Sequence, residues 1–134
     1  MRLALCIAAV AIAAGSAIGA TPTAKTTPAG TLKAEIAAFN AKNYRAAYAA
    51  YTARFKARCP YATFAKHTAQ QRAMAPAPIA VRIKTSHITG ARATLTYDIL
   101  LAGQQVSHVT AKSPDIFVRI KGLWYDDIDA QTSC

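Results

Sequence analysis

The side chains in this sequence that best suit acid–base or hydrogen-bonding chemistry are one histidine and several tyrosines. His108 lies in an alternating segment, residues 105–112, on the face that we assign to the interior. Tyr97 belongs to the strand predicted before it, and Tyr48 and Tyr51 share one face of a predicted helix. A histidine among tyrosine hydroxyls can serve as an acid, a base or a ligand contact, although such histidines are more often hydrogen-bonded core or rim residues.

The carboxylates are placed less well for catalysis. Asp98 lies inside a predicted strand, but alternation sets it opposite the apolar face, so we expect it to point away from any pocket, with an arginine as its surface partner. Asp126, Asp127 and Asp129 follow the last strand without the glycine and glutamate of a calcium loop, and we interpret them as a solvated strand end. The sequence contains no zinc, phosphate-loop, nucleophile-elbow or dinucleotide motif, so we expect no metal and no cofactor.

The first twenty residues predict a secretory signal peptide. Arg2 precedes an apolar run that ends in small residues, LALCIAAVAIAAGSAIGA. We expect cleavage after Ala20, and cuts after Ala17 or Gly19 stay open as alternatives. An uncleaved membrane anchor is disfavoured because small residues stand where a spanning helix prefers large apolar ones. The expected location is therefore secreted, periplasmic or in the cell envelope.

The cysteines predict one disulfide. Cys6 leaves with the signal peptide, which gives Cys59 and Cys134 to a mature chain in an oxidising compartment. A bond between them would close a long loop and contribute about 4 kcal/mol. Two free thiols or an intermolecular bond remain as alternatives.

The charge balance is strongly basic, with 16 Lys and Arg against 6 Asp and Glu. For an exported protein this favours an anionic partner such as an envelope surface or an acidic protein, and the compartment argues against nucleic acid. The basic residues are spread singly, with no compact run of five, so solubility alone explains the charge equally well.

Helical periodicity occupies the first half of the mature chain. Residues 21–31, TPTAKTTPAGT, are predicted to be a flexible arm that precedes a single domain, residues 32–134. The apolar spacing predicts three helices, at residues 32–41, 44–55 and 60–74. Thr31 and Asn43 are suited to cap the first two.

Beyond the prolines at 76 and 78 the apolar period falls from 3.6 to 2. Strands are predicted at residues 79–84, 92–101, 105–112, 116–120 and 123–128, joined by short turns. Helices followed by consecutive strands indicate an α+β domain, in which the helices cover one face of an antiparallel meander of four to five strands. The last two strands form a hairpin around Lys121-Gly122, and Trp124 is interpreted as a core residue.

The pattern resembles the NTF2-like (nuclear transport factor 2-like) superfamily, the cone fold shared with ketosteroid isomerases and SnoaL-type cyclases. The likeness covers residues 32–129 and rests on FNAKNYRAAYAAYTARFKARC, similar to the short opening helices, and on GARATLTYDILLAGQQV and DIFVRIKGLWYDDI, similar to the closing strands. The resemblance implies a curved sheet whose concave face, closed by three N-terminal helices, forms a pocket. It also implies a homodimer through the outer sheet face, which would carry Thr94, Thr96, Leu100 and Val109.

Our leading hypothesis is a non-catalytic exported domain that binds a small apolar ligand or a protein partner. The pocket candidates are Tyr48, Tyr51, Tyr97, His108 and Trp124. The alternative is a ketosteroid-isomerase-like enzyme acting on a hydrophobic small molecule, with His108 and Tyr97 as acid/base and hydrogen-bond donor. A further alternative is a basic accessory module held to an anionic envelope surface by charge.

Overall fold

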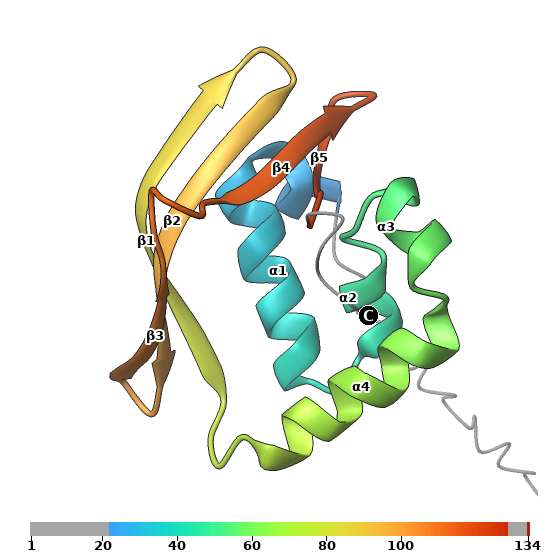
Figure 1. Cartoon of the computed structure of the whole chain (residues 1–134), viewed down its shortest axis with the longest axis vertical. Coiled ribbons are helices and arrows are strands. Elements are labelled where there is room, and N and C mark those ends of the chain that lie inside the picture. Colours follow the sequence, from blue (N-terminus) through green and yellow to red (C-terminus); the bar gives the residue numbers. More distant parts are fainter. Residues whose placement is uncertain (1–21, 129–133) are drawn as a thin grey trace, which may run out of the picture.

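The structure is a computed structural model that describes residues 22–128 and residue 134 (Figure 1). Within these residues, a 3₁₀ turn and four α-helices precede a five-stranded antiparallel sheet, which confirms the predicted α+β class. The helical elements are η1 Pro22–Thr26, α1 Pro28–Asn40, α2 Tyr44–Tyr48, α3 Ala53–Arg58 and α4 Tyr61–Met74. The strands are β1 Ile79–Thr89, β2 Arg92–Leu101, β3 Gln104–Val109, β4 Asp115–Ile120 and β5 Leu123–Asp126.

Helix α1 starts earlier than its apolar spacing predicts, inside the segment for which we expected a flexible arm. Thr27 is the N-cap, because its side chain accepts a hydrogen bond from the backbone N–H of Gly30, and Pro28 occupies the first turn. Thr31, the predicted cap, is buried instead, and its hydroxyl donates to the carbonyl oxygen of Trp124 at 3.0 Å. This bond ties the start of α1 to the last strand.

The helix predicted over residues 44–55 is divided into α2 and α3. At the break the backbone pairs with the end of β5: the Asp126 N–H donates to Ala50, and the Thr52 N–H donates to Asp126. Thr52 also caps α3, accepting a hydrogen bond from Phe55 N–H. Long-range backbone pairing therefore overrides the local helical preference, and it places Tyr51 beside Asp126.

Strand β2 organises the open sheet. Its whole length pairs with β1, whereas on its other side β4 pairs with residues 92–95 and β3 pairs with residues 97–101. Helix α1 lies against the sheet, and α2, α3 and α4 lie beyond it (Figure 1). The predicted Lys121-Gly122 turn joins β4 to β5, and both of its residues have positive φ, as a type I′ hairpin turn requires.

Among the described residues, the core consists of two neighbouring clusters. The first joins α1 to the sheet and contains Leu32, Ala93, Leu95, Tyr97, Phe117 and Trp124. The second lies between the helices and contains Ala38, Ala47, Tyr51, Phe55, Cys59 and Phe64. Trp124 is buried in the first cluster, as predicted, and the predicted disulfide between Cys59 and Cys134 is present beside the second.

The predicted signal peptide with its cleavage sites, and Asp129, lie outside the described residues. In the part of the chain that the structure does describe, none of the helices has the length and apolar character needed to cross a bilayer.

Candidate functional site

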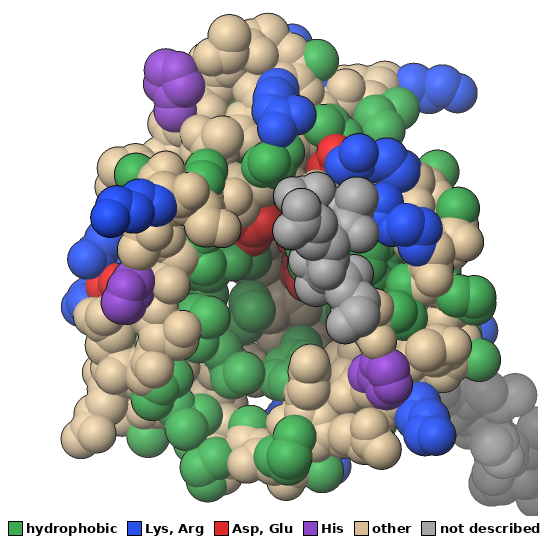
Figure 2. All heavy atoms as spheres, viewed as in Figure 1, with side chains coloured by type: hydrophobic (Ala, Val, Ile, Leu, Met, Phe, Trp, Pro, Cys, Tyr) green, Lys and Arg blue, Asp and Glu red, His purple; other side chains and the backbone are tan. Residues whose placement is uncertain are grey.

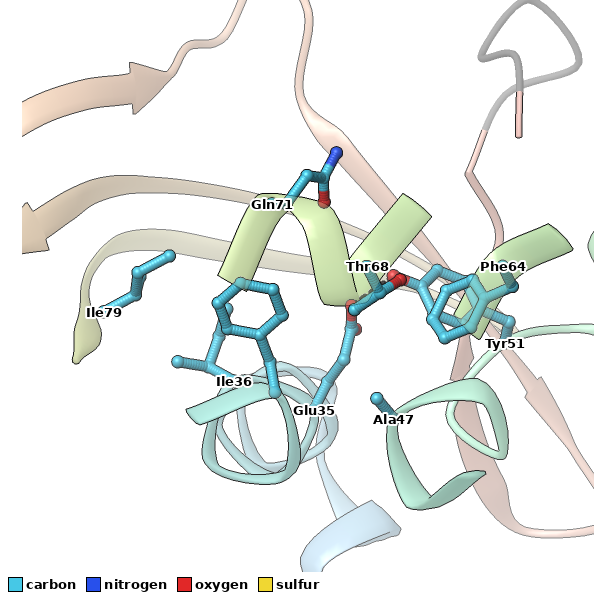
Figure 3. A pocket seen from close by; sticks show the side chains of 9 residues that line it. Glu35, Ile36, Ala47, Tyr51, Phe64, Thr68, Gln71 and Ile79 are labelled. Carbon is cyan, nitrogen blue, oxygen red and sulfur yellow. Dashed lines mark hydrogen bonds between the residues drawn. The ribbon is translucent and has the colours of Figure 1, made fainter. Parts of the chain in front are cut away.

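A cavity of about 340 Å³ lies between α1, α2, α4 and the first residue of β1. Its lining is mostly apolar, with a few polar side chains (Figure 3), and consists of Glu35, Ile36, Phe39, Ala47, Tyr51, Phe64, Thr68, Gln71 and Ile79. In the space-filling view, the face between the sheet and α4 is hollowed, with hydrophobic side chains lining the hollow and acidic side chains in its wall (Figure 2). An apolar cavity with few polar groups is typical of a small-molecule site.

Glu35 projects from α1 into this cavity, toward Tyr51 and Thr68 (Figure 3). The Tyr51 hydroxyl donates a hydrogen bond to Oε1 of Glu35. The tyrosine ring stacks on Phe55 at a centroid distance of 4.4 Å and meets Phe64 edge-on at 5.4 Å. Packing on both sides therefore fixes the direction in which the Tyr51 hydroxyl points.

A second carboxyl group, that of Asp126 at the end of β5, lies beside Glu35. Asp126 is 2 % exposed, and its carboxyl group and that of Glu35 hydrogen-bond one another. Glu35 Oε2 and Asp126 Oδ1 are buried, and no backbone N–H, side-chain N–H or hydroxyl group of the described residues donates to either oxygen. Because two carboxylates cannot hydrogen-bond without a proton, this contact favours a state in which the pair holds one proton between the two groups.

Asp115, the first residue of β4, completes what we call the acidic cluster: Glu35, Asp115 and Asp126. The Tyr97 hydroxyl donates to Asp115 Oδ2 at 2.8 Å, and the backbone N–H of Ile116 donates to Oδ1 at 3.0 Å. These two hydrogen bonds stabilise the ionised form of Asp115, whereas the other two carboxyl groups of the cluster accept fewer hydrogen bonds.

Burial dominates the electrostatics of the acidic cluster. It raises the pKa of Glu35 to about 7, with the charge of Asp115 adding to the effect and the Tyr51 hydrogen bond opposing it. Burial, followed by the charge of Glu35, raises the pKa of Asp126 well above its ordinary value. The pKa of Asp115 is also raised by burial, against the Tyr97 hydrogen bond. The cluster therefore exchanges a proton near neutral pH.

Burial also raises the pKa of Tyr51 and of Tyr97, and the neighbouring carboxylates add to both shifts. Both hydroxyls thus remain protonated and act as hydrogen-bond donors to the acidic cluster.

Asp98 and His108 lie on the other face of the sheet. Asp98 is directly opposite Arg82 and His108 in neighbouring strands, and it pairs with Arg82 at 2.7 Å and Lys84 at 3.3 Å. The hydrogen bond from Arg82 is the main reason that the pKa of Asp98 is held below its ordinary value. Asp98 thus points away from the cavity with an arginine partner, as alternation predicts.

His108 is not brought together with the tyrosines. Its neighbour Val109 is the residue opposite Tyr97, so His108 lies on the outer face. A register shift at residues 99–100 interrupts the pairing of β2 with β3, and Val106 lies at this shift, whereas Val109 is directly opposite Tyr97. Apolar alternation in this weak strand therefore could not assign the histidine to a face.

The other sequence candidates have separate positions. Of the five, Tyr51 is the one found among the described residues that line the cavity. Tyr97 contacts the acidic cluster through Asp115, whereas Tyr48 donates its hydroxyl proton to the carbonyl of Cys59 at 2.7 Å. Trp124 is a core residue.

The interpretation of Asp126 and Asp127 as a solvated strand end is wrong. They are 2 % and 8 % exposed, because the chain after Trp124 runs between the α2–α3 break and β4, where the N–H of Asp127 donates to Ile116. Asp127 accepts a hydrogen bond from the Thr52 hydroxyl at 2.8 Å and pairs with Arg54 at 2.7 Å.

Glu35 and Asp115 were missed in the sequence, yet a signal for Glu35 is present. It belongs to the apolar stripe of α1, between Leu32 and Ile36. An acid inside such a stripe is driven into the interior with it. Asp126 gives a similar signal, since it lies two residues after Trp124 in a predicted strand and therefore shares the face of that core residue.

Among the described residues, no group of three or more His, Cys, Asp or Glu side chains could hold a metal ion. No protein-family model matches the chain, and no curated protein matches it in sequence. The site must therefore be understood from its own chemistry: an apolar cavity with Glu35 in its wall, the proton-sharing contact of Glu35 with Asp126, and two tyrosine hydroxyls that donate to the acidic cluster.

Proposed function

We propose that this chain is an exported domain of the NTF2-like superfamily that binds a small, mainly apolar ligand in the cavity between α1 and α4. The order of helices followed by an antiparallel sheet supports the family. The observation that carries the ligand-binding role is the cavity itself, whose volume of about 340 Å³ is near the lower end of the range for small-molecule sites. The ligand is therefore compact, with the size of one ring system or a short alkyl chain.

Filling the cavity tests this role. The side chain of Ala47 points into the cavity (Figure 3), so Ala47→Leu would place additional methyl groups there. We expect the variant to bind the neutral fluorescent probe N-phenylnaphthylamine about tenfold more weakly, a loss of about 1.4 kcal/mol. Its stability should fall by less than the 1–3 kcal/mol typical of an overpacked core, since the cavity accommodates the change.

Ala57→Leu is the matched control, because Ala57 is exposed on α3 and does not line the cavity. Probe fluorescence titration and urea denaturation on both variants give the two quantities. Equal probe affinity for Ala47→Leu and Ala57→Leu would show that the probe does not occupy the cavity, and would contradict the proposed role.

A second function is favoured by one observation, the proton-sharing pair of Glu35 and Asp126, of which Glu35 lines the cavity. A base with a pKa near 7 is well matched to proton transfer at neutral pH. The corresponding reaction is a ketosteroid-isomerase-like double-bond shift, in which a proton leaves the α-carbon of an unconjugated enone and returns at the γ-carbon. Glu35, rather than His108, would be the base.

Conversion of cyclohex-3-enone to its conjugated isomer, followed by ultraviolet absorbance, tests this second function. We expect the rate to rise with pH through about 7 as Glu35 ionises, and Glu35→Gln to lower it by about 10²–10⁴. A wild-type rate equal to that of the buffer, or to that of Glu35→Gln, would rule out catalysis of this isomerisation.

A further inference from the structure

We propose that the ligand of this cavity is an organic cation: a compact apolar molecule that places a protonated amine against Glu35. This inference rests on the proposed ligand-binding role and specifies the class of ligand. It follows from an imbalance of charge, from carboxyl oxygens that receive no N–H or hydroxyl hydrogen bond, and from the aromatic side chains around them.

The imbalance of charge is local and opposite to that of the whole chain. No Lys or Arg is among the described residues that line the cavity, and the salt bridges found in the described part of the chain involve Asp98 and Asp127, not the acidic cluster. The groups that face Glu35 are Asp126 from β5, Asp115 from β4 and the Tyr51 hydroxyl. A buried carboxylate is stabilised by a cation or by protonation, and without a cation this pair retains a proton.

The hydrogen-bonding geometry favours a donor. Glu35 lines the cavity, and no N–H or hydroxyl group of the described residues donates to its Oε2 atom, which leaves the proton held with Asp126 as its partner. An ammonium group carries N–H donors and no acceptor, so it complements this oxygen and can also donate to the hydroxyl of Thr68 or the amide oxygen of Gln71 on α4.

Aromatic rings complete the site for a cation. Tyr51, Phe64 and Phe39 all contribute to the lining. A cation over an aromatic face gains about 0.5–2 kcal/mol, the larger value where water is excluded. The rest of the lining, Ile36, Ala47 and Ile79, suits an apolar body.

Other ligand charges fit less well. An anion would meet the negative charge of the acidic cluster at short range. A neutral ligand without a donor leaves the carboxyl pair protonated and gains only from apolar contact. Binding of an ammonium also has a distinct signature: its charge lowers the pKa of the carboxyl pair, so the shared proton is released.

Three molecules with the same ring separate these cases: cyclohexylmethylamine, cyclohexylmethanol and cyclohexanecarboxylate. Each is titrated calorimetrically into the exported protein with its disulfide intact, at about pH 6.5, in two buffers that differ in ionisation enthalpy. We expect the amine to bind at least tenfold more tightly than the alcohol, and the carboxylate more weakly than either. Amine binding should release a proton, up to one per site, and alcohol binding none.

Two variants locate the effect. Glu35→Gln keeps the shape of the side chain but removes its charge, and we expect it to abolish the preference of the amine over the alcohol together with the proton release. Asp98→Asn removes an equal charge on the outer face of the sheet. It should leave the preference for the amine and the proton release unchanged. Thermal unfolding of each variant checks that the fold persists.

The outcomes are distinct. If the alcohol binds as tightly as the amine, or if Glu35→Gln and Asp98→Asn weaken amine binding equally, the cation proposal is overturned while the apolar cavity remains a binding site. If N-phenylnaphthylamine and all three molecules fail to bind the wild-type protein, the proposed binding function fails as well.

Discussion

Raising the pH from about 5 to about 8 should destabilise this protein by about 3 kcal/mol, the reverse of what a paired surface carboxylate produces. The pKa of Glu35 is raised from 4.5 to about 7 by burial in the folded state. The unfolded chain loses this proton near pH 4.5, whereas the folded chain keeps it until about pH 7. Stability from this group is therefore complete below about pH 4.5 and is lost as the pH rises through about 7.

Asp126 acts in the same direction, because burial also raises its pKa. The contribution of Asp98 to stability depends on pH in the opposite direction. Because its folded-state pKa is lowered from 3.8, this contribution is lost only as the pH falls below the range tested. Free energies of unfolding from urea denaturation at several pH values give the curve. The difference between the wild type and Glu35→Gln isolates Glu35, since every histidine is common to both. A stability that is flat or rises between about pH 5 and about pH 8 in the wild type would contradict the account.

Removing the disulfide should cost about 4 kcal/mol. Cys59 and Cys134 are 75 residues apart, so their bond closes a long loop in the unfolded chain. The bond lowers the conformational entropy of the unfolded chain, and this effect grows with the length of the loop. Since small domains are stable by only about 5–15 kcal/mol, the reduced protein should be marginally stable.

The double variant Cys59→Ala/Cys134→Ala and the wild type with a reductant measure this loss in different ways. Cys59 is buried, so the double variant adds a packing loss that reduction does not. The urea midpoint should fall in both, and further in the variant. If the midpoint is unchanged after thiol titration confirms full reduction, the bond does not constrain the unfolded chain as we argue.

The sequence was sufficient for the architecture because the architecture depends on local patterns. The change of apolar period after the prolines at 76 and 78 separates helices from strands, and Lys121-Gly122 meets the φ requirements of a hairpin turn. Cys6 belongs to the predicted signal peptide, and the other two cysteines allow one intramolecular pairing, which the structure contains.

The acidic cluster could not be predicted in the same way, since it depends on contacts between distant segments. Asp126 is buried because the α2–α3 break pairs with it, and that break is itself invisible in a helical sequence pattern. Asp115 acquires its role from Tyr97, which lies on β2, the strand that pairs with β4. His108 was assigned to the interior because apolar residues occur at both parities of its strand, and only the register places it outside.

The most direct test of the buried acid pair is the pKa of Glu35 itself. Glu35 is the one glutamate in the sequence, so a protein made with glutamate labelled by carbon-13 at the side-chain carboxyl carbon gives a single resonance to follow by NMR as the pH is changed. We predict a midpoint at about 7, moved to lower pH by saturating cyclohexylmethylamine. A midpoint near 4.5, the ordinary value for a solvated glutamate, would contradict the buried, proton-sharing pair on which the proposed site depends.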